Sequence, residues 1–289
     1  MIIHDYSPLR YPNNKRWLAS FFDFEMRKMG IYGGTFAEVF GGGCDVGINL
    51  LAEGTATKLR INDYDRGIVA FWNCVCLHPN WMTQKIRETD VTLAEWYKQR
   101  EILQTSDDKS PEYGFATLFL NRTSIGGYLN GTPVGGFYGD TTRTIEESFD
   151  KKKVGLNIRF VKRYAKYIRV TDFDAKYYNQ FCTRRTPKDS LIYFDPPCHK
   201  TDTVSLFPWT LYDHEAFLDS IQYVPHSRLW ILTFDCNDEL KQIYGSKYEI
   251  AKITKPGGPS AYITCSDYIN MMPTQEELDN NGINLIIEN

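Results

Sequence analysis

The sequence predicts an α/β fold, with a Rossmann-like sheet and an inserted, mainly helical domain. Apolar runs of strand length end at acidic residues, and helical patterns alternate with them, which is typical of a parallel sheet. This alternation stops between residues 79 and 167, where no buried strand is evident. We therefore expect a first catalytic-domain part at 1–78, an insertion at 79–167 and a second catalytic-domain part at 168–289.

The composition favours a globular protein over membrane-spanning, secreted and disulfide-rich classes. With 289 residues, 42% of them hydrophobic, the chain can bury a large core. No apolar run is long enough to cross a membrane, and the first residues do not resemble a signal peptide. Seven scattered cysteines without a Cys-x-x-Cys pair favour reduced thiols in a cytoplasmic protein over zinc or a disulfide framework. The net charge of −3 means that any nucleic-acid surface is local.

The individual elements follow from local patterns. Leu18, Phe21, Phe22 and Met26 recur at helical spacing, so a helix follows the Asn-Asn turn. Further helices are expected at 65–78, 93–103 and 113–120. Strands are expected at 36–40, 59–62, 168–171, 191–194 and 229–234, with a closing antiparallel pair at 248–253 and 261–265. The tail from Pro273 looks peripheral.

A glycine loop follows the first strand. Gly41-Gly42-Gly43 permits a tight turn and close approach to a ligand, and Asp45 is expected to cap the next helix. Asp63 lies 20 positions after Gly43, at the end of the second strand, where an acid binds ribose hydroxyls. The order predicts a nucleotide-cofactor site; the alternative is a plain loop and an ordinary helix cap.

A second site is expected after the apolar strand at 191–194. Asp195-Pro196-Pro197-Cys198 forms a stiff turn that presents Asp195 and a proline carbonyl as hydrogen-bond acceptors, unless it merely ends the strand. Asp63, Asp172, Asp195 and Asp235 all follow predicted strands, so a parallel sheet places them at one edge. Asp172 and the next residue, Phe173, would border a cofactor base, or Asp172 would cap a helix.

The insertion carries two candidate DNA-contacting segments. Gly-Gly and Asn-Gly pairs at 121–131 predict a polar, partly aromatic hairpin suited to a groove, or a surface excursion. Residues 151–169 hold eight basic side chains and no acidic one. Arg159, Lys162, Arg163 and Lys166 recur at helical spacing, so one helix face would contact phosphates or simply be solvated.

Taken together, the chain from about residue 10 to 270 resembles the Dam family of DNA adenine-N6 methyltransferases. Tyr11-Pro12-Asn13-Asn14-Lys15 resembles the family's aromatic–Gly–Gly–Lys motif, which contacts the cofactor, and residues 38–43 resemble its Glu-Pro-Phe-x-Gly-x-Gly loop. Asn62-Asp63-Tyr64-Asp65 resembles its Asn-Asp-x-Asp, whose first Asp binds ribose. Residues 118–122 resemble the start of its DNA-contacting hairpin. Asp195-Pro196-Pro197 matches its catalytic motif, with Cys198 in place of the usual aromatic residue.

The resemblance implies methylation of adenine N6 in double-stranded DNA by S-adenosylmethionine, after base flipping and without a metal. It implies a restriction-modification setting in the cytoplasm of a bacterial or phage-infected cell. The implied catalytic residues are Asp195, Pro196, Pro197 and Cys198; those for the cofactor are Tyr11, Lys15, Phe40, Gly41, Gly43, Asp63, Asp172 and Phe173; and those for DNA are Asn121, Arg122, Tyr128, Asn130, Arg159, Lys162, Arg163 and Lys166.

Cys198 leaves two alternatives open. A thiol cannot stack on a flipped base as an aromatic ring does. Either Phe207 or Trp209 supplies the missing ring, or the chain is a catalytically silent relative that only binds. Alternatively, Cys198 acts as the nucleophile of a pyrimidine-modifying enzyme, with His199 or a nearby cation lowering its pKa. The other motifs favour adenine methylation.

Overall fold

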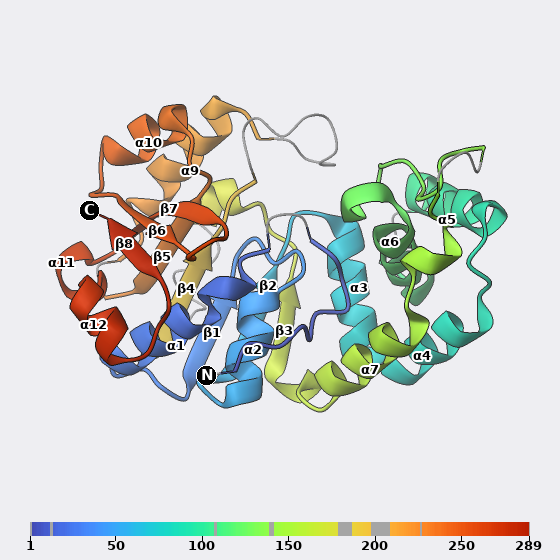
Figure 1. Ribbon diagram of the computed structural model, residues 1–289, viewed down its shortest axis with the longest axis horizontal. Coiled ribbons are helices and arrows are strands. Elements are labelled where there is room, and N and C mark those ends of the chain that lie inside the picture. The colour runs from blue at the N-terminus through green and yellow to red at the C-terminus, as the bar shows by residue number, and fades with distance from the viewer. Residues whose placement is uncertain are drawn as a thin grey trace.

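The computed structural model describes residues 2–11, 14–106, 109–138, 142–178, 187–197, 209–225 and 227–288. Within these ranges the centre of the molecule is an eight-stranded sheet in the order β3-β2-β1-β4-β5-β7-β6-β8 (Figure 1). The strands from β3 to β5 are parallel, whereas β7, β6 and β8 join in antiparallel fashion. The predicted α/β fold with a Rossmann-like sheet is confirmed.

The element bounds agree closely with the sequence patterns. The strands are β1 Gly34–Glu38, β2 Ala56–Asn62, β3 Ile168–Thr171, β4 Ser190–Phe194, β5 Leu229–Phe234, β6 Ala251–Thr254, β7 Ser260–Cys265 and β8 Ile286–Glu288. The α-helices are α1 Ala19–Lys28, α2 Asp45–Glu53, α3 Arg66–Leu77, α4 Pro79–Glu88, α5 Leu93–Thr105, α6 Pro111–Thr123, α7 Lys151–Lys162, α9 Leu211–Ile221, α10 Asp238–Gly245, α11 Tyr268–Met271 and α12 Gln275–Asn280.

Helices cover both faces of the sheet, so side chains that point to either side of a strand are buried. On β4, Leu191 and Tyr193 belong to one core, with α1, α2 and α3, whereas Ile192 and Phe194 belong to another, with α9 and α10. All four apolar side chains are almost fully buried. This arrangement explains why the sequence of β4 is an unbroken apolar run. Polar side chains can lie only at the ends of the strand.

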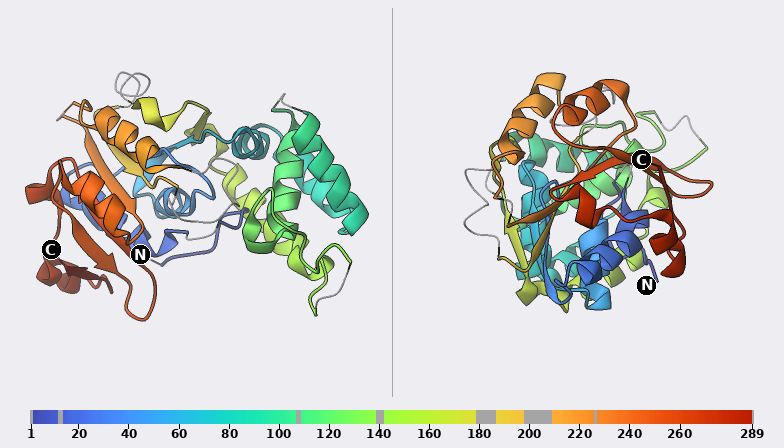
Figure 2. Two further views of the ribbon diagram at one scale, coloured as in Figure 1. Left: turned by 90° about the horizontal axis from the view of Figure 1, so that it is seen from above. Right: turned by 90° about the vertical axis from the view of Figure 1, so that its left-hand side faces the viewer.

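The helices between β2 and β3 gather at one end of the molecule, beyond the edge strand β3 (Figures 1 and 2). The described residues between 79 and 167 form no strand, only helices, turns and one isolated bridge, Ser124 to Pro133. Helix α6 packs tightly on α3: a Cβ at Gly114 would lie 2.7 Å from the Ala70 carbonyl oxygen, and one at Gly67 would lie 2.6 Å from the Thr117 hydroxyl. Small residues therefore hold the insertion against the sheet domain.

Four local expectations differ from the structure. Residues 121–123 end helix α6, whose buried inner face continues to Thr123, so the hairpin-like pairing starts only at Ser124, which forms an antiparallel bridge with Pro133. Helix α7 ends at Lys162, so the predicted basic stripe is not one helix face. Cys44, not Asp45, is the N-cap of α2. The C-terminal tail is not peripheral, since β8 pairs with β6 and Leu278 and Leu285 are buried.

None of the helices in the described ranges is both long enough and apolar enough to cross a membrane.

Candidate active site

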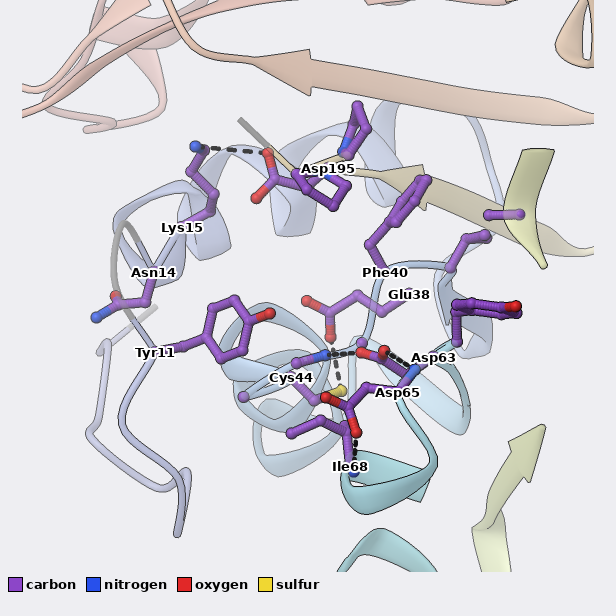
Figure 3. A pocket seen from close by; sticks show the side chains of 18 of the residues that line it. Tyr11, Asn14, Lys15, Glu38, Phe40, Cys44, Asp63, Asp65, Ile68 and Asp195 are labelled. Atoms are coloured by element: carbon purple, nitrogen blue, oxygen red, sulfur yellow. Dashed lines mark hydrogen bonds and ion pairs between the residues drawn. The ribbon is translucent and has the colours of Figure 1, made fainter. Parts of the chain in front are cut away.

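A pocket of about 440 Å³ opens at the carboxyl ends of β1, β2, β4 and β5, the edge at which open parallel sheets bind ligands (Figure 3). The predicted site residues that line it are Tyr11, Lys15, Phe40, Gly41, Gly43, Asp63, Asn121, Tyr128, Asp195, Pro196 and Pro197. Figure 3 shows Asp195 and Lys15 on one side, Asp63, Asp65 and Cys44 on the other, and Tyr11 between them. The structure thus brings the glycine loop and the Asp-Pro-Pro turn into one cavity.

The glycine loop is held by close contacts that leave no room for side chains. A Cβ at Gly41 would lie 2.5 Å from the Ile61 side chain, because the loop packs directly on β2. Gly42 has a positive φ of 41°, and the Trp72 indole donates a hydrogen bond of 2.9 Å to its carbonyl oxygen. The Tyr11 ring lies over the same glycine. These contacts fix the loop as one wall of the pocket.

The loop departs from the family motif at its end. Counted from Glu38, the second motif glycine falls on Cys44, which has a left-handed φ of 51° that costs a residue with a Cβ about 1–2 kcal/mol. Its thiol donates a hydrogen bond of 2.6 Å to Glu38, and the same carboxylate oxygen accepts from the Gly47 N–H at 3.1 Å. Burial raises the pKa of Glu38 to about 8 and that of the Cys44 thiol well above its usual value. Cys44 is therefore a protonated donor at neutral pH.

Asp63 is held by backbone groups. Its carboxylate accepts a hydrogen bond of 2.8 Å from the Gly42 N–H and one of 2.9 Å from the Asp65 N–H. Burial, together with the nearby Asp65 carboxylate, raises the pKa of Asp63 to about 7, and the backbone hydrogen bonds oppose this rise. A ligand that brings hydroxyl donors would add stabilising hydrogen bonds to this carboxylate.

Asp195 is held by side chains instead. The Lys15 ammonium lies 3.4 Å from Asp195 Oδ1 and 3.6 Å from Asp235 Oδ1, so one cation bridges the carboxyl ends of β4 and β5. The Thr233 hydroxyl donates a hydrogen bond of 2.8 Å to the same Oδ1. Burial raises the pKa of Asp195, while Lys15 and Thr233 oppose the rise. The Lys15 side chain is 9% exposed, whereas that of Asp195 is 25% exposed, so the lysine is nearly buried and the carboxylate still reaches the pocket.

The lining fits S-adenosylmethionine, whose sulfonium and ammonium groups are both cationic. Eight carboxylates face the pocket against only two lysines: Glu38, Asp45, Asp63, Asp65, Asp174, Asp195, Asp213 and Asp235, with Lys15 and Lys176. Lys176 is itself engaged, 2.9 Å from Asp213. A cationic ligand suits this excess of acidic over basic groups, because a positive charge nearby lowers the carboxyl pKa values that burial raises. The described residues hold no group of three or more His, Cys, Asp or Glu arranged for a metal ion.

Asp172 and Phe173 are not among the residues that line the pocket, although their strand ends at the predicted edge. The Asp172 carboxylate is half exposed and pairs with Lys109 of the insertion. The Phe173 backbone N–H donates to the Asn62 side chain at 3.1 Å. Asp174, two residues further on, lines the pocket instead and caps the short helix that follows. The cofactor role of Asp172 and Phe173 stays a prediction, and Asp174 is the acid of this segment that reaches the pocket.

Asn121 and Arg122 make internal contacts. The Asn121 side chain bonds to both the N–H and the carbonyl oxygen of Arg10, at 2.7 and 2.6 Å, and is 1% exposed. The Arg122 guanidinium donates to the Pro8 carbonyl oxygen at 2.8 Å, and burial lowers its pKa to about 10. Both residues therefore fasten the N-terminal segment to α6 and are not displayed to DNA.

The other predicted DNA residues are exposed or partly exposed. Tyr128 is partly buried and lines the pocket, whereas Asn130 is exposed and does not. Arg159, Lys162, Arg163 and Lys166 are all exposed, but they precede β3 and so lie toward its amino end, away from the pocket. Arg163 lies 4.4 Å above the Phe160 ring, and Lys162 bonds to Asn80 at 3.0 Å. The structure does not bring this group to the pocket.

Cys198, His199 and Phe207 lie outside the described residues. Trp209 is described: it lines the pocket, is 8% exposed, and packs edge-on against Phe40 at 5.2 Å. Sequence reasoning missed Glu38, Cys44, Asp174, Lys176 and Thr233. The first two are motif positions, and counting from Glu38 would have shown that the last glycine is replaced.

The chain was compared with solved structures, curated sequences and family profiles. Two solved structures of the rRNA methyltransferase AviRa from Streptomyces viridochromogenes resemble the chain, one at 15% identity, covering 91% of this chain and 90% of that one, with a TM-score of 0.42. The other is 13% identical, with 91% and 88% covered and a TM-score of 0.41. No curated protein sequence matches. The profile of the D12 class N6 adenine-specific DNA methyltransferases matches residues 11–227. The chain therefore belongs to the D12 class of N6 adenine-specific DNA methyltransferases.

Proposed function

We propose that the pocket is the active site in which this D12-class methyltransferase modifies adenine N6 of double-stranded DNA. The observation that supports this proposal is the shared cavity: the glycine loop with Asp63 forms one side, and Asp195 with Pro196 forms the other. A cofactor on the first side and a base on the second would meet at the middle of the pocket.

In this proposal the glycine-loop side holds S-adenosylmethionine, which supplies an electrophilic methyl group when bound. Asp63 accepts hydrogen bonds from the ribose hydroxyls while the Gly42 N–H keeps the carboxylate in place. The Tyr11 ring lies over the same glycine and closes the site from above. The surrounding carboxylates favour the two cationic groups of the cofactor.

The Asp195 side binds the target amino group. Adenine N6 is a weak nucleophile because its lone pair is delocalised into the ring. Asp195 and the Pro196 carbonyl oxygen accept its two hydrogens, which favours a pyramidal nitrogen with a localised lone pair. This is positioning and electrostatic stabilisation, without a covalent intermediate on the protein. An ionised Asp195 is the stronger acceptor, and Lys15 opposes the rise that burial causes in its pKa.

The base reaches Asp195 only outside the DNA stack, so the proposal includes base flipping at a cost of a few kcal/mol. Trp209 is packed between Phe40 and α9 and is held in the wall. Partly exposed aromatic rings reach the pocket from Tyr11, Tyr64 and Tyr128. Tyr128 comes from the insertion, so the segment proposed to contact DNA also contributes to the pocket.

The experiment is nucleoside mass spectrometry of mixed-sequence DNA incubated with the protein and methyl-labelled S-adenosylmethionine. Label in N6-methyladenine supports the proposal. Label in 5-methylcytosine would overturn it and would make Cys198 the nucleophile. Cofactor binding by calorimetry without any methyl transfer, on DNA from several sources, would favour a silent relative. We further propose the cytoplasm as the compartment, since its DNA substrate and scattered cysteines suit it.

A further inference from the structure

Two hydroxyl groups, those of Thr233 and Tyr193, lie near Asp195 at the end of β4. Strands β4 and β5 are parallel, with Phe194 paired to Leu232, so the next residues, Asp195 and Thr233, are neighbours across the sheet. Tyr193 shares a face with Asp195 because alternate residues of a strand point the same way. The sheet register therefore places two hydroxyls and one carboxylate side by side.

The hydrogen bonds among these three groups have one consistent direction. The Thr233 hydroxyl donates its only hydrogen to Asp195 Oδ1 at 2.8 Å. The Tyr193 hydroxyl lies 2.8 Å from the Thr233 oxygen and must be the donor there, because the threonine hydrogen is already used. Tyr193 is 2% exposed and Thr233 is fully buried, so water does not compete for either hydroxyl.

This chain occupies one oxygen of the carboxylate. Lys15 also approaches Oδ1, at 3.4 Å. Within the described ranges no hydrogen bond to Oδ2 is present, and Figure 3 shows the second oxygen of Asp195 turned toward the interior of the pocket. One oxygen is thus held by the protein and the other is left to accept the amino hydrogen of the substrate.

We infer that Thr233 is a positioning residue for methyl transfer: it holds Asp195 Oδ1 so that Oδ2 faces the adenine N6 amino group, and Tyr193 in turn orients the Thr233 hydroxyl. This inference rests on the proposed function of the pocket. It assigns a role to β5, which carries none of the family motifs compared above. A hydrogen bond from a buried hydroxyl to a carboxylate both fixes the carboxylate's rotamer and favours its ionised form.

The test is the isosteric substitution Thr233→Val, with Thr233→Ser as the rescue that restores the hydroxyl. Thr264→Val is the matched control. Thr264 is an equally buried threonine on the adjoining strand β7, paired with Leu232, but its hydroxyl donates to the Glu249 carbonyl oxygen at 2.7 Å, away from the site. Both substitutions keep a β-branched residue in a strand, so secondary structure should be retained.

Thr233→Val is expected to lower kcat by roughly 10- to 100-fold, as loss of a hydrogen bond to a charged group implies, with the cofactor Kd changed less than about 2-fold. Thr233→Ser should stay within about 3-fold of the wild type, and Thr264→Val should match it. The acid limb of the kcat profile should move to higher pH in Thr233→Val, because the ionised form of Asp195 loses a donor.

A second readout does not depend on turnover. Titration of the Asp195 carboxyl by carbon NMR, assigned with Asp195→Asn, should give a higher pKa in Thr233→Val than in the wild type. Within the described ranges the charged or titratable groups that act on Asp195 are Lys15, Asp235, Glu38 and Tyr193, and the substitution leaves all four residues in place.

An unchanged Asp195 titration in Thr233→Val overturns the inference, as does an equal loss of kcat in Thr264→Val. A wild-type protein that methylates no adenine would refute the proposed function, and the titration would still decide whether Thr233 holds Asp195.

Discussion

Two carboxylates on opposite sides of the pocket are fixed by different means. Asp63 and Asp195 both follow parallel strands, and burial raises the pKa of each. The Asp63 carboxylate accepts hydrogen bonds from the backbone N–H groups of Gly42 and Asp65. The Asp195 carboxylate instead accepts a hydrogen bond from the Thr233 side chain and forms an ion pair with Lys15. Backbone donors survive most substitutions, but side-chain donors do not. The position of Asp63 should therefore depend on the backbone conformation of the glycine loop, and that of Asp195 on the side chains of Thr233 and Lys15.

The largest effect is expected at Asp195. Asp195→Ala removes the acceptor for the amino group and should lower kcat by about 10²- to 10³-fold, as loss of one electrostatic contact to a reacting group does elsewhere. The cofactor Kd, measured by calorimetry, should change little. A variant that lost cofactor affinity to the same extent as kcat would show that the two sides of the pocket are not separate.

Asp63→Ala should give the opposite pattern. The lost hydrogen bonds to ribose should raise the cofactor Kd by roughly 10- to 100-fold, while kcat at saturating cofactor stays within about 3-fold of the wild type. Steady-state kinetics at varied cofactor concentration measure both quantities. An unchanged Kd would contradict the assignment of this carboxylate to the ribose.

The carboxyl group of Glu25 extends the comparison, because neither backbone nor side-chain donors bind it within the described ranges. Glu25 of α1 is fully buried, and neither of its oxygens has a hydrogen-bond partner within the described ranges. Burial raises its pKa to about 8 from the ordinary 4.5. The folded state therefore binds its proton more tightly than the unfolded state, and the free energy of unfolding should fall as pH rises from about 4.5 to 8.

Glu25→Gln should remove this dependence. We expect it to stabilise the protein by about 1–2 kcal/mol at pH 9 and to change stability little at pH 5. Urea unfolding at both pH values checks this. Equal effects at the two pH values would mean that Glu25 is not protonated in the folded state below its raised pKa.

The smallest effect is expected at Cys44. Cys44→Gly relieves the left-handed backbone conformation, at about 1–2 kcal/mol, but loses the thiol hydrogen bond to Glu38 and gains chain entropy in the unfolded state. A net stabilisation of about 0.5 kcal/mol should result. Thermal unfolding beside Cys74→Ala, a buried cysteine outside the loop, supplies the comparison.

The fold could be predicted because its signals are local. Apolar runs such as 191–194 and 229–234 are buried on both faces, and each stops at a polar turn. The end of α6 was placed too early, because the predicted hairpin segment starts at residue 121. The end of α7 was placed too late, because the basic spacing continues to Lys166. The eighth strand was missed because three residues near a chain end carry little pattern of their own.

The site could be predicted only where a motif is continuous in sequence. Asp195 and the glycine loop were found in this way. The internal hydrogen bonds of Asn121 and Arg122 could not be predicted, because their partners lie 111 to 114 residues away, in the N-terminal segment. Thr233 gave no signal at all, since threonine is an ordinary strand residue and its role arises from the register between β4 and β5.

On the proposal that the insertion contacts DNA, the packing of α3 against α6 limits how the target sequence could change during evolution. The tip of the insertion is free to diverge, but Gly67 and Gly114 sit where a larger side chain would collide with the opposite helix. Asp65, the N-cap of α3, also donates a backbone hydrogen bond to the Asp63 carboxylate. New specificities should therefore arise by replacement of the outer loops and helices, while the seam between the two helices is inherited unchanged.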